Sequence, residues 1–214
     1  MPGWLRLLDR IEDREVIIVP IRKAVKADAP ALAKLKHEVE GPLYQSYGTE
    51  AEHREDMARY ASVDYIDENL AAANTTIYLA EDQRGIIGMV AATAEPDSCF
   101  IFSLVARYKR AGIGSALVRA AVTGTPDDGS GHNRVWCEVF EDNVGARRFF
   151  ERLGFQEFGR RASMSYLSHT LLQLQAQSAE VLRRLSEGSG QLAHPPPDTY
   201  KEKADSRERA GNED

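Results

Sequence analysis

The stretch LVARYKRAGIGSALV, residues 104–118, carries the most information in this sequence. It begins with strand-like residues, continues through the basic pair Lys109 and Arg110, and enters a helical pattern at Gly112 and Gly114. Glycine lets a backbone approach a ligand closely, and the free N–H groups of a helix's first turn bind phosphate oxygens. The stretch therefore predicts a loop that binds a pyrophosphate.

Two well-known phosphate-binding motifs do not fit this loop. The dinucleotide fingerprint GxGxxG requires a third glycine where Leu117 stands. A Walker loop requires Gly-Lys-Ser/Thr, which is absent from the sequence, and the second glycine-rich segment, Gly124 to Gly129, runs into Ser130 without a lysine. Neither a Rossmann dinucleotide site nor a P-loop is expected.

Around the loop, short apolar runs alternate with stretches of helical period. Helices are expected over residues 28–39, ended by Gly41 and Pro42, twice within 49–73, with Asp64 as a cap, and over 112–122 and 143–153. Strands are expected at 16–25, 75–80, 86–94, 100–105, 135–140, 155–158 and 162–167. This order predicts an α/β (α+β) fold with a mixed sheet and helices on its faces.

The two ends of the chain differ from its centre in composition. We predict an N-terminal amphipathic segment at 1–15, a main domain at 16–168, a C-terminal helix at 169–187 and a disordered tail at 188–214. The tail is rich in proline and charge and has few apolar residues, too few to offset the entropy of ordering. The ends alone would suit a protein-interaction module, which leaves the glycine turn unexplained.

Composition excludes several classes of function. The net charge of −6 disfavours a partner held by nucleic-acid phosphates. No apolar stretch approaches the roughly 18 residues of a membrane span, so we expect a cytoplasmic protein that does not bind membranes. Cys99 and Cys137 are expected to be reduced core thiols, and the five histidines have no metal-binding spacing, so no metal site is predicted.

At the glycine turn the sequence resembles the GCN5-related N-acetyltransferase superfamily. That family opens a helix with Q/R-x-x-G-x-G/A, and KRAGIG, residues 109–114, is similar if lysine is accepted first. The resemblance extends to IRKAVKADAPALAKL from Ile21, IYLAEDQRGIIGMV from Ile77 and CEVFEDNVGARRFFERLGF from Cys137. Together these segments cover about residues 16–167 in the family's order.

The resemblance implies a mostly antiparallel sheet, splayed between its fourth and fifth strands, with acetyl-CoA in the split. Backbone groups of the fourth strand would bind pantetheine, the glycine turn would bind pyrophosphate, and an asparagine would lie near the pantetheine arm. Arg107 and Arg147 are weaker candidates for the phosphates. The implied cofactor-binding residues are Leu104, Val105, Ala106, Lys109, Arg110, Ala111, Gly112, Ile113, Gly114, Ser115, Asn143 and Phe150.

The activity implied is acetyl transfer from acetyl-CoA to a primary amine by direct attack in a ternary complex. The family commonly protonates the departing thiolate with a tyrosine, and Phe150 holds that place here. A thiol pKa of about 8.5 makes thiolate a tolerable leaving group, and Tyr44, Tyr47, Tyr108 or a water can substitute. The alternative is an acyl-CoA-binding relative with weak or no catalysis, acting as a sensor or regulatory partner.

Glu138, in an otherwise apolar strand beside the expected split, is the first candidate for the general base, followed by Glu95 and Glu81. Its structural alternative is an ion pair at the sheet edge. Residues 50–68 are rich in acidic side chains and predict a cationic amine acceptor, although a solvated helix face explains them equally well. A small amine, a peptide N-terminus and a lysine side chain stay open as acceptors, as do a monomer and a homodimer.

Overall fold

The computed structural model describes residues 19–45, 47–109, 111–124, 132–166 and 168–187. The predicted N-terminal segment at 1–15 and the predicted tail at 188–214 lie outside these residues, so both stay predictions. The division of the chain into domains likewise remains a prediction.

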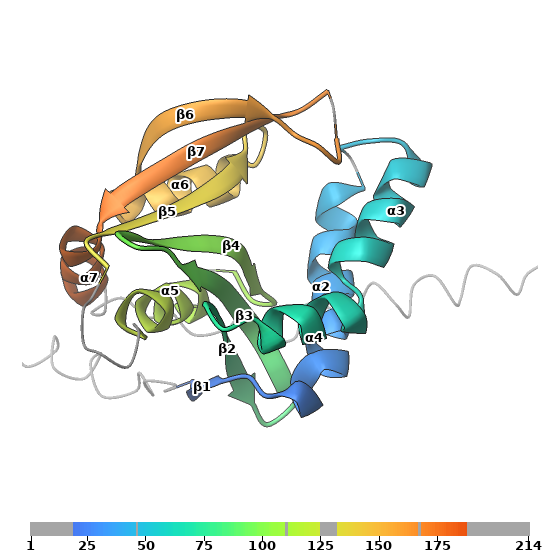
Figure 1. The fold of residues 1–214 in the computed structure, drawn as a ribbon, viewed down its shortest axis with the longest axis horizontal. Helices are drawn as coiled ribbons and strands as arrows, with labels where there is room; N and C mark the ends of the chain where they lie inside the picture. The colour runs from blue at the N-terminus through green and yellow to red at the C-terminus, as the bar shows by residue number, and fades with distance from the viewer. Residues whose placement is uncertain (1–18, 46, 110, 125–131, 167, 188–214) are drawn as a thin grey trace, which may run out of the picture.

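A seven-stranded sheet forms the centre of the fold (Figure 1). The strand order is β1-β2-β3-β4-β5-β7-β6, and every neighbouring pair is antiparallel except β4 and β5, which are parallel. The predicted hairpin between the second and third strands is confirmed, with Gly85 at a φ of 112° in its turn. The strands are β1 Ile21–Lys23, β2 Thr75–Asp82, β3 Gly85–Ala94, β4 Ser98–Ala106, β5 Arg134–Phe140, β6 Gln156–Ala162 and β7 Thr170–Gln177.

Helices cover both faces of the sheet (Figure 1). One buried cluster joins α2 and α4 to β2, β3 and β4, and a second joins α5, α6 and α7 to the opposite face. The mixed sheet flanked by helices confirms the predicted fold class. The helices are the short 3-10 helix η1 Lys26–Asp28, then α2 Ala29–Tyr44, α3 Glu50–Tyr60, α4 Val63–Ala71, α5 Ile113–Thr123, α6 Val144–Arg152 and α7 Ser178–Glu187.

Two predicted helix boundaries are wrong. Helix α2 continues through Gly41 and Pro42 to Tyr44. The proline removes only one backbone donor near the end of the helix, and the last turn still closes with a 3.1 Å hydrogen bond from the Gln45 N–H to the Gly41 carbonyl. Helix α4 is capped by Ser62, whose hydroxyl accepts from the Tyr65 N–H at 3.1 Å, and Asp64 lies in the first turn instead.

The segment predicted as a C-terminal helix at 169–187 is a strand followed by a shorter helix. Strand β7 reads TLLQLQAQ, and Leu172, Leu174 and Ala176 are buried while the residues between them are more exposed. This alternation has a period of two, and β7 lies between β5 and β6 with antiparallel partners on both sides. Pairing thus overrides the helix propensity of leucine, glutamine and alanine. The last predicted strand, 162–167, is correspondingly replaced by β6 ending at Ala162.

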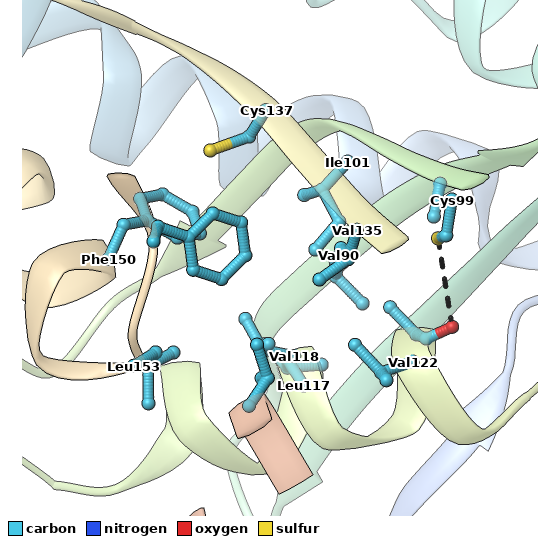
Figure 2. Packing of buried hydrophobic residues seen from close by; sticks show 14 of the residues in the cluster. Val90, Cys99, Ile101, Leu117, Val118, Val122, Val135, Cys137, Phe150 and Leu153 are labelled. Atoms are coloured by element: carbon cyan, nitrogen blue, oxygen red, sulfur yellow. Dashed lines mark hydrogen bonds between the residues drawn. The ribbon is translucent and has the colours of Figure 1, made fainter. Parts of the chain in front are cut away.

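The two cysteines are free and buried, as predicted (Figure 2). The Cys99 thiol lies 3.9 Å from the Ala121 carbonyl oxygen of α5. Burial, with a smaller contribution from the Glu95 charge, raises the pKa of Cys99 to about 12. Burial also raises the pKa of Cys137, so both thiols stay protonated and act as small apolar core residues.

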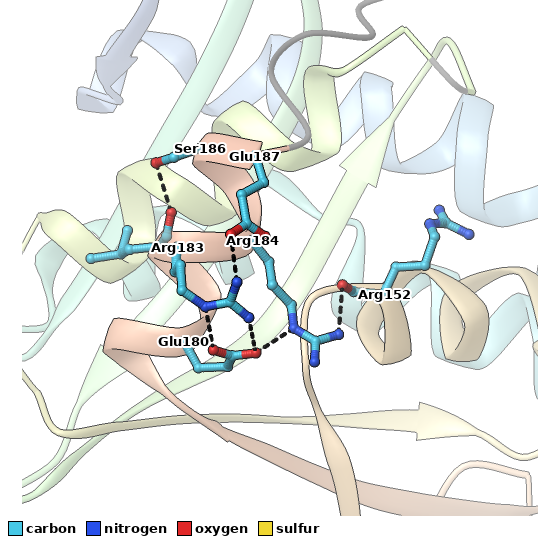
Figure 3. A network of polar contacts seen from close by, with 7 residues as sticks. Arg152, Glu180, Arg183, Arg184, Ser186 and Glu187 are labelled. Atoms are coloured by element: carbon cyan, nitrogen blue, oxygen red, sulfur yellow. Dashed lines mark hydrogen bonds and ion pairs between the residues drawn. The ribbon is translucent and has the colours of Figure 1, made fainter.

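Helix α7 is fastened to α6 by a network of polar contacts (Figure 3). The Glu180 carboxylate accepts from Arg183 at 2.8 Å and from Arg184 at 2.5 Å, and a second nitrogen of Arg184 donates to the Arg152 carbonyl at 3.2 Å. The hydrogen bonds from Arg183 and Arg184 lower the pKa of Glu180 to about 2. The chain turns after α6 at Gly154, whose φ of 92° favours glycine.

Candidate functional site

Strands β4 and β5 separate part-way along their length. They pair only from Ser98 to Ile101 against Arg134 to Cys137, while β4 continues to Ala106 and β5 to Phe140. The backbone beyond Ile101 therefore faces a gap, and the predicted splay between the fourth and fifth strands is confirmed.

A β-bulge lies at the point where the two strands part. The register of β4 with β3 passes from Ile101 opposite Ala92 to Ser103 opposite Ala91, so it skips Phe102. The register with β5 ends at Ile101. Phe102 thus has no register partner in either β3 or β5, which is the irregularity of a β-bulge.

The backbone beyond the bulge alternates in direction. The Arg107 N–H donates to the Ile87 carbonyl at 2.8 Å, which fixes the alternation along this antiparallel pair. Val105 therefore bonds toward Met89, and the backbone groups of Leu104 and Ala106 face the gap. Of the three predicted pantetheine contacts, the geometry suits Leu104 and Ala106 and does not suit Val105.

Helix α5 begins at the glycine turn. Gly112 is the N-cap, with a φ of 77° in the left-handed region, so a side chain there would be strained. The N–H groups of Ile113, Gly114 and Ser115 occupy the first helical turn, where no intrahelical acceptor exists. Three donors and the positive end of the helix dipole together form an anion-binding position.

The other residues of the predicted phosphate loop are placed less completely. Lys109 is exposed beside the turn and Ala111 is half-buried, whereas Arg110 lies outside the described residues. The two weaker candidates have other partners, because Arg107 pairs with Glu38 at 2.6 Å and Arg147 donates to the Glu141 carbonyl at 3.1 Å. Each of these arginines is therefore positioned by a partner in the protein.

A cavity of about 340 Å³ occupies the split and extends beneath α2 and α3. Leu104 and Phe102 line it from β4, and Glu138 lines it from β5. Asn143 and Phe150 line it from the α6 side, and helices α2 and α3 and the β6–β7 connection supply the rest of its wall. The cavity thus brings Leu104, Asn143, Phe150 and Glu138 together among the predicted site residues.

Asn143 and Phe150 are positioned by helix α6. The Asn143 side chain accepts from the Ala146 N–H at 3.1 Å and caps the helix, which fixes its orientation at the cavity. Phe150 is 4% exposed and packs against Phe149 and Phe155, with ring centroids 5.1 and 4.9 Å apart. The place where the family commonly has a tyrosine hydroxyl is therefore apolar.

The Glu138 carboxylate is held at the cavity wall by one arginine and one glutamine. Arg161 donates to both of its carboxylate oxygens, with a 2.6 Å bond from Nε to Oε1, and Gln173 donates to Oε1 at 3.1 Å. Burial alone raises the pKa of Glu138, but the Arg161 and Gln173 hydrogen bonds and the Arg161 charge outweigh it, so the pKa lies below its ordinary value. The ion pair expected as the structural alternative is present, and the role of base stays a prediction.

The two further candidates for a base have structural partners outside the cavity. Glu81 pairs with Arg22 at 2.8 Å. Glu95 accepts from the Ser98 hydroxyl at 2.5 Å and from the Trp136 indole at 2.9 Å. Both carboxylates thus make structural contacts at strand ends and do not line the cavity.

Lys36 and Glu40 form a buried ion pair in the cavity wall, which the sequence reasoning missed. Their charged groups lie 2.7 Å apart with 6% and 12% of the side chains exposed, and the Lys36 ammonium also donates to the Ser103 hydroxyl at 3.2 Å. Lys36 follows Leu32 by four positions on the apolar face of α2. A charged residue on the apolar face of a helix is expected to have a buried partner, and this pattern could have identified Lys36 from the sequence.

Aromatic rings line the far end of the cavity. Tyr44 and Phe140 have ring centroids 5.7 Å apart, and Tyr166 lies 6.3 Å from Tyr44. Burial raises the pKa of Tyr44 well above its ordinary value. Of the tyrosines considered as substitutes for the missing hydroxyl, Tyr44 lines the cavity, Tyr47 packs against Phe140 and His169, and Tyr108 packs against the cluster around α5.

Two classes of feature are absent from the described part of the chain. No group of three or more histidine, cysteine, aspartate or glutamate side chains there is arranged to hold a metal ion. No helix among the same residues has the length and apolar character needed to cross a bilayer.

The glycine turn and the split are the features that the resemblance to acetyltransferases predicts, and comparison with known proteins agrees. The acetyltransferase (GNAT) family profile matches residues 41–155, more than half of the sequence. The chain belongs to the GNAT acetyltransferase family. A comparison with curated protein sequences found no match.

Solved structures with the same fold include three acetyltransferases. The PaiA N-acetyltransferase of Thermoplasma acidophilum, in complex with coenzyme A, is 15% identical, with a TM-score of 0.64 over 75% of this chain and 99% of that chain. The ribosomal-protein-S18-alanine N-acetyltransferase of Escherichia coli is 14% identical, with a TM-score of 0.57 over 86% and 99%. NAA60 of Arabidopsis thaliana, in complex with a bisubstrate analogue, is 14% identical, with a TM-score of 0.56 over 74% and 97%. At these identities the likeness shows the fold.

Proposed function

We propose that this protein transfers the acetyl group of acetyl-CoA to a primary amine by direct attack in a ternary complex. The observation that carries the proposal is the alignment of the glycine turn with the β4–β5 split. Anion-binding N–H groups lie at the start of α5, unpaired backbone groups run along β4, and a cavity for a second substrate lies beyond the bulge.

Acetyl-CoA fits this arrangement in extended form. The pyrophosphate would bind the N–H groups of Ile113, Gly114 and Ser115, with Lys109 and Arg110 adding charge. The pantetheine arm would hydrogen-bond to the backbone of Leu104 and Ala106, as a strand added to the open edge of β4. The thioester carbonyl would then lie at the Phe102 N–H.

The chemistry begins when a neutral amine attacks the thioester carbon. The carbonyl oxygen becomes an oxyanion, and we propose that the N–H of Phe102, a residue with no register partner in β3 or β5, stabilises it. Collapse of the adduct breaks the carbon–sulfur bond, forms the amide and releases CoA as a thiolate. One proton leaves the nitrogen and one reaches the sulfur, so each needs a carrier.

Lys36 is the group we propose as proton donor to the thiolate. Lys36 lines the cavity from α2, which packs on the face of the sheet opposite Phe150, and its ammonium contacts Ser103, the residue after Phe102. The lysine can regain its proton from the amine nitrogen as the adduct collapses, and Glu40 stabilises its charge meanwhile. Glu138, the base expected from the sequence, is paired with Arg161, so we give it a structural role and the incoming amine enters in its neutral form.

Amine-dependent release of CoA thiol tests the proposed function. The protein is mixed with acetyl-CoA and a panel of primary amines, and free thiol and acetylated amine are both measured. We expect equal amounts of the two products, and a rate that rises with pH as the amine loses its proton. Acetyl-CoA binding by calorimetry without thiol release from any amine would favour the alternative, an acyl-CoA-binding protein without catalysis, for which the apolar Phe150 is the specific observation.

A further inference from the structure

The charged side chains that line the cavity do not sum to zero. Three carboxylates line it, and two of them are paired with cations: Glu40 with Lys36 at 2.7 Å, and Glu138 with Arg161. The third, Asp56, makes no ion pair with any residue of the described chain and accepts one hydrogen bond, from the Tyr166 hydroxyl at 3.2 Å. The cavity therefore carries one uncompensated negative charge, located on α3.

Tyr166 lines the cavity on the same side. This side chain is 2% exposed, and the β6–β7 connection that carries it meets the segment leading into α3 (Figure 1). A Cβ atom added at Gly48 would lie 2.8 Å from the Tyr166 ring, so the ring packs directly against the α2–α3 connection. With its hydroxyl bonded to Asp56, Tyr166 joins the connection to α3.

The wall beside Asp56 is aromatic. Tyr44, Tyr60 and Tyr166 line the cavity there with Phe140, and the rings of Phe140 and Tyr166 lie 5.8 Å apart. Aromatic faces attract cations, and the attraction is larger where water is excluded. A carboxylate lined by aromatic rings is a suitable site for an alkylammonium group.

We propose that the acceptor is a short α,ω-diamine or a polyamine, whose distal ammonium binds Asp56 while its other amine reaches the thioester. The attacking amine must be neutral, so a charge near Asp56 serves a second nitrogen that keeps its proton. The identity of this ligand as an acceptor rests on the proposed function, whereas its binding at Asp56 does not.

Binding is measured first, by calorimetry on the protein saturated with CoA. The probes are diaminobutane and butylamine, which share a carbon chain and differ in one ammonium group. We expect diaminobutane to bind about tenfold more tightly or better, from one additional charge-assisted hydrogen bond. The Asp56→Asn variant keeps an acceptor for Tyr166 and loses the charge, so it should bind the two amines equally. Glu55→Gln, at the exposed neighbouring position, is the matched control and should retain the preference.

The outcomes separate the two proposals. Equal binding of the two amines by the wild type, or an undiminished preference in Asp56→Asn, overturns the ammonium site even where both amines are acetylated. A preference lost in Asp56→Asn supports the site, and if acetyl-CoA then yields no thiol with diaminobutane, the proposed function fails while the site stands. Faster acetylation of a short peptide than of any diamine contradicts a diamine or polyamine as the acceptor.

Discussion

Lys36 and Glu40 form an ion pair of 2.7 Å within the cavity wall, one helical turn apart on α2. Removing two charges from water costs several kcal/mol per ion and is tolerated where geometry and further hydrogen bonds compensate. Here the Ser103 hydroxyl supplies a further bond at 3.2 Å. The Lys36 ammonium therefore joins α2 to β4 beside the bulge, where the acetyl group would lie.

Replacing Lys36 by arginine separates its charge from its ability to transfer a proton. A guanidinium keeps the ion pair with Glu40 but does not deprotonate in proteins. If Lys36 protonates the thiolate, Lys36→Arg should lower kcat by about 10²-fold or more while leaving acetyl-CoA binding intact. Thiol-release kinetics and calorimetry measure the two quantities.

A second substitution tests the same role from the opposite side of the cavity. Phe150→Tyr places a hydroxyl where the family commonly has one, so it should recover at least about tenfold of the activity lost in Lys36→Arg. The same change in the wild type should alter kcat little. Wild-type activity in Lys36→Arg, or no recovery in the double variant, would remove Lys36 from proton transfer.

Gly112→Ala is expected to weaken both the fold and the binding of acetyl-CoA. The φ of 77° at Gly112 costs a residue with a Cβ atom about 1–2 kcal/mol, and relaxing that strain would misplace the first N–H groups of α5. Chemical denaturation and calorimetry measure the two effects. Gly41→Ala is the control, because a Cβ atom there meets nothing within 4 Å. Unchanged acetyl-CoA affinity in Gly112→Ala would place the pyrophosphate elsewhere.

Glu138→Gln distinguishes a general base from an ion-pair partner. Loss of a base should lower kcat by about 10²-fold or more. Loss of the Arg161 pair should instead lower the free energy of unfolding by about 0.5–1 kcal/mol with kcat nearly unchanged. We expect the second result, because the lowered pKa of Glu138 makes its carboxylate a weaker base.

Glu180 predicts a pH dependence of stability that one substitution removes. Its pKa is about 2 in the folded protein against 4.5 as its ordinary value, so the stabilising contribution is complete above about pH 4.5 and disappears as the pH falls toward 2. Glu180→Gln should therefore lower Tm slightly at neutral pH and equal the wild type near pH 2. Equal Tm values at neutral pH would show that the network of Figure 3 does not stabilise α7.

The parts of the structure that could be predicted are those determined by local chemistry. Gly112 and Gly114 before an amphipathic run predicted the start of α5, and Gly85 between two apolar runs predicted the hairpin. Strand β7 could not be recognised in the same way. Its leucines and glutamines suit a helix equally, and only the flanking strands β5 and β6 decide its conformation.

The glycine turn of the candidate site could be predicted because its function depends on backbone groups of one short segment. Contacts between side chains that are far apart in the sequence could not be predicted. Phe102 looks like an ordinary strand residue, because a bulge depends on the register of β3. The Tyr166 hydroxyl and Asp56 are 110 positions apart in sequence, and the Arg161 and Glu138 pair requires β6, β7 and β5 to lie side by side. No local pattern contains these contacts.

The Phe102→Pro variant tests most directly whether acetyl transfer takes place at the bulge. Proline removes the one N–H proposed to stabilise the oxyanion, at a residue that has no register partner in β3 or β5. With Tm and acetyl-CoA affinity measured in parallel, we predict that amine-dependent thiol release falls by about 10²–10³-fold while acetyl-CoA still binds. Thiol release within about twofold of the wild-type rate would contradict the account, since 1.4 kcal/mol of lost transition-state stabilisation alone corresponds to about tenfold.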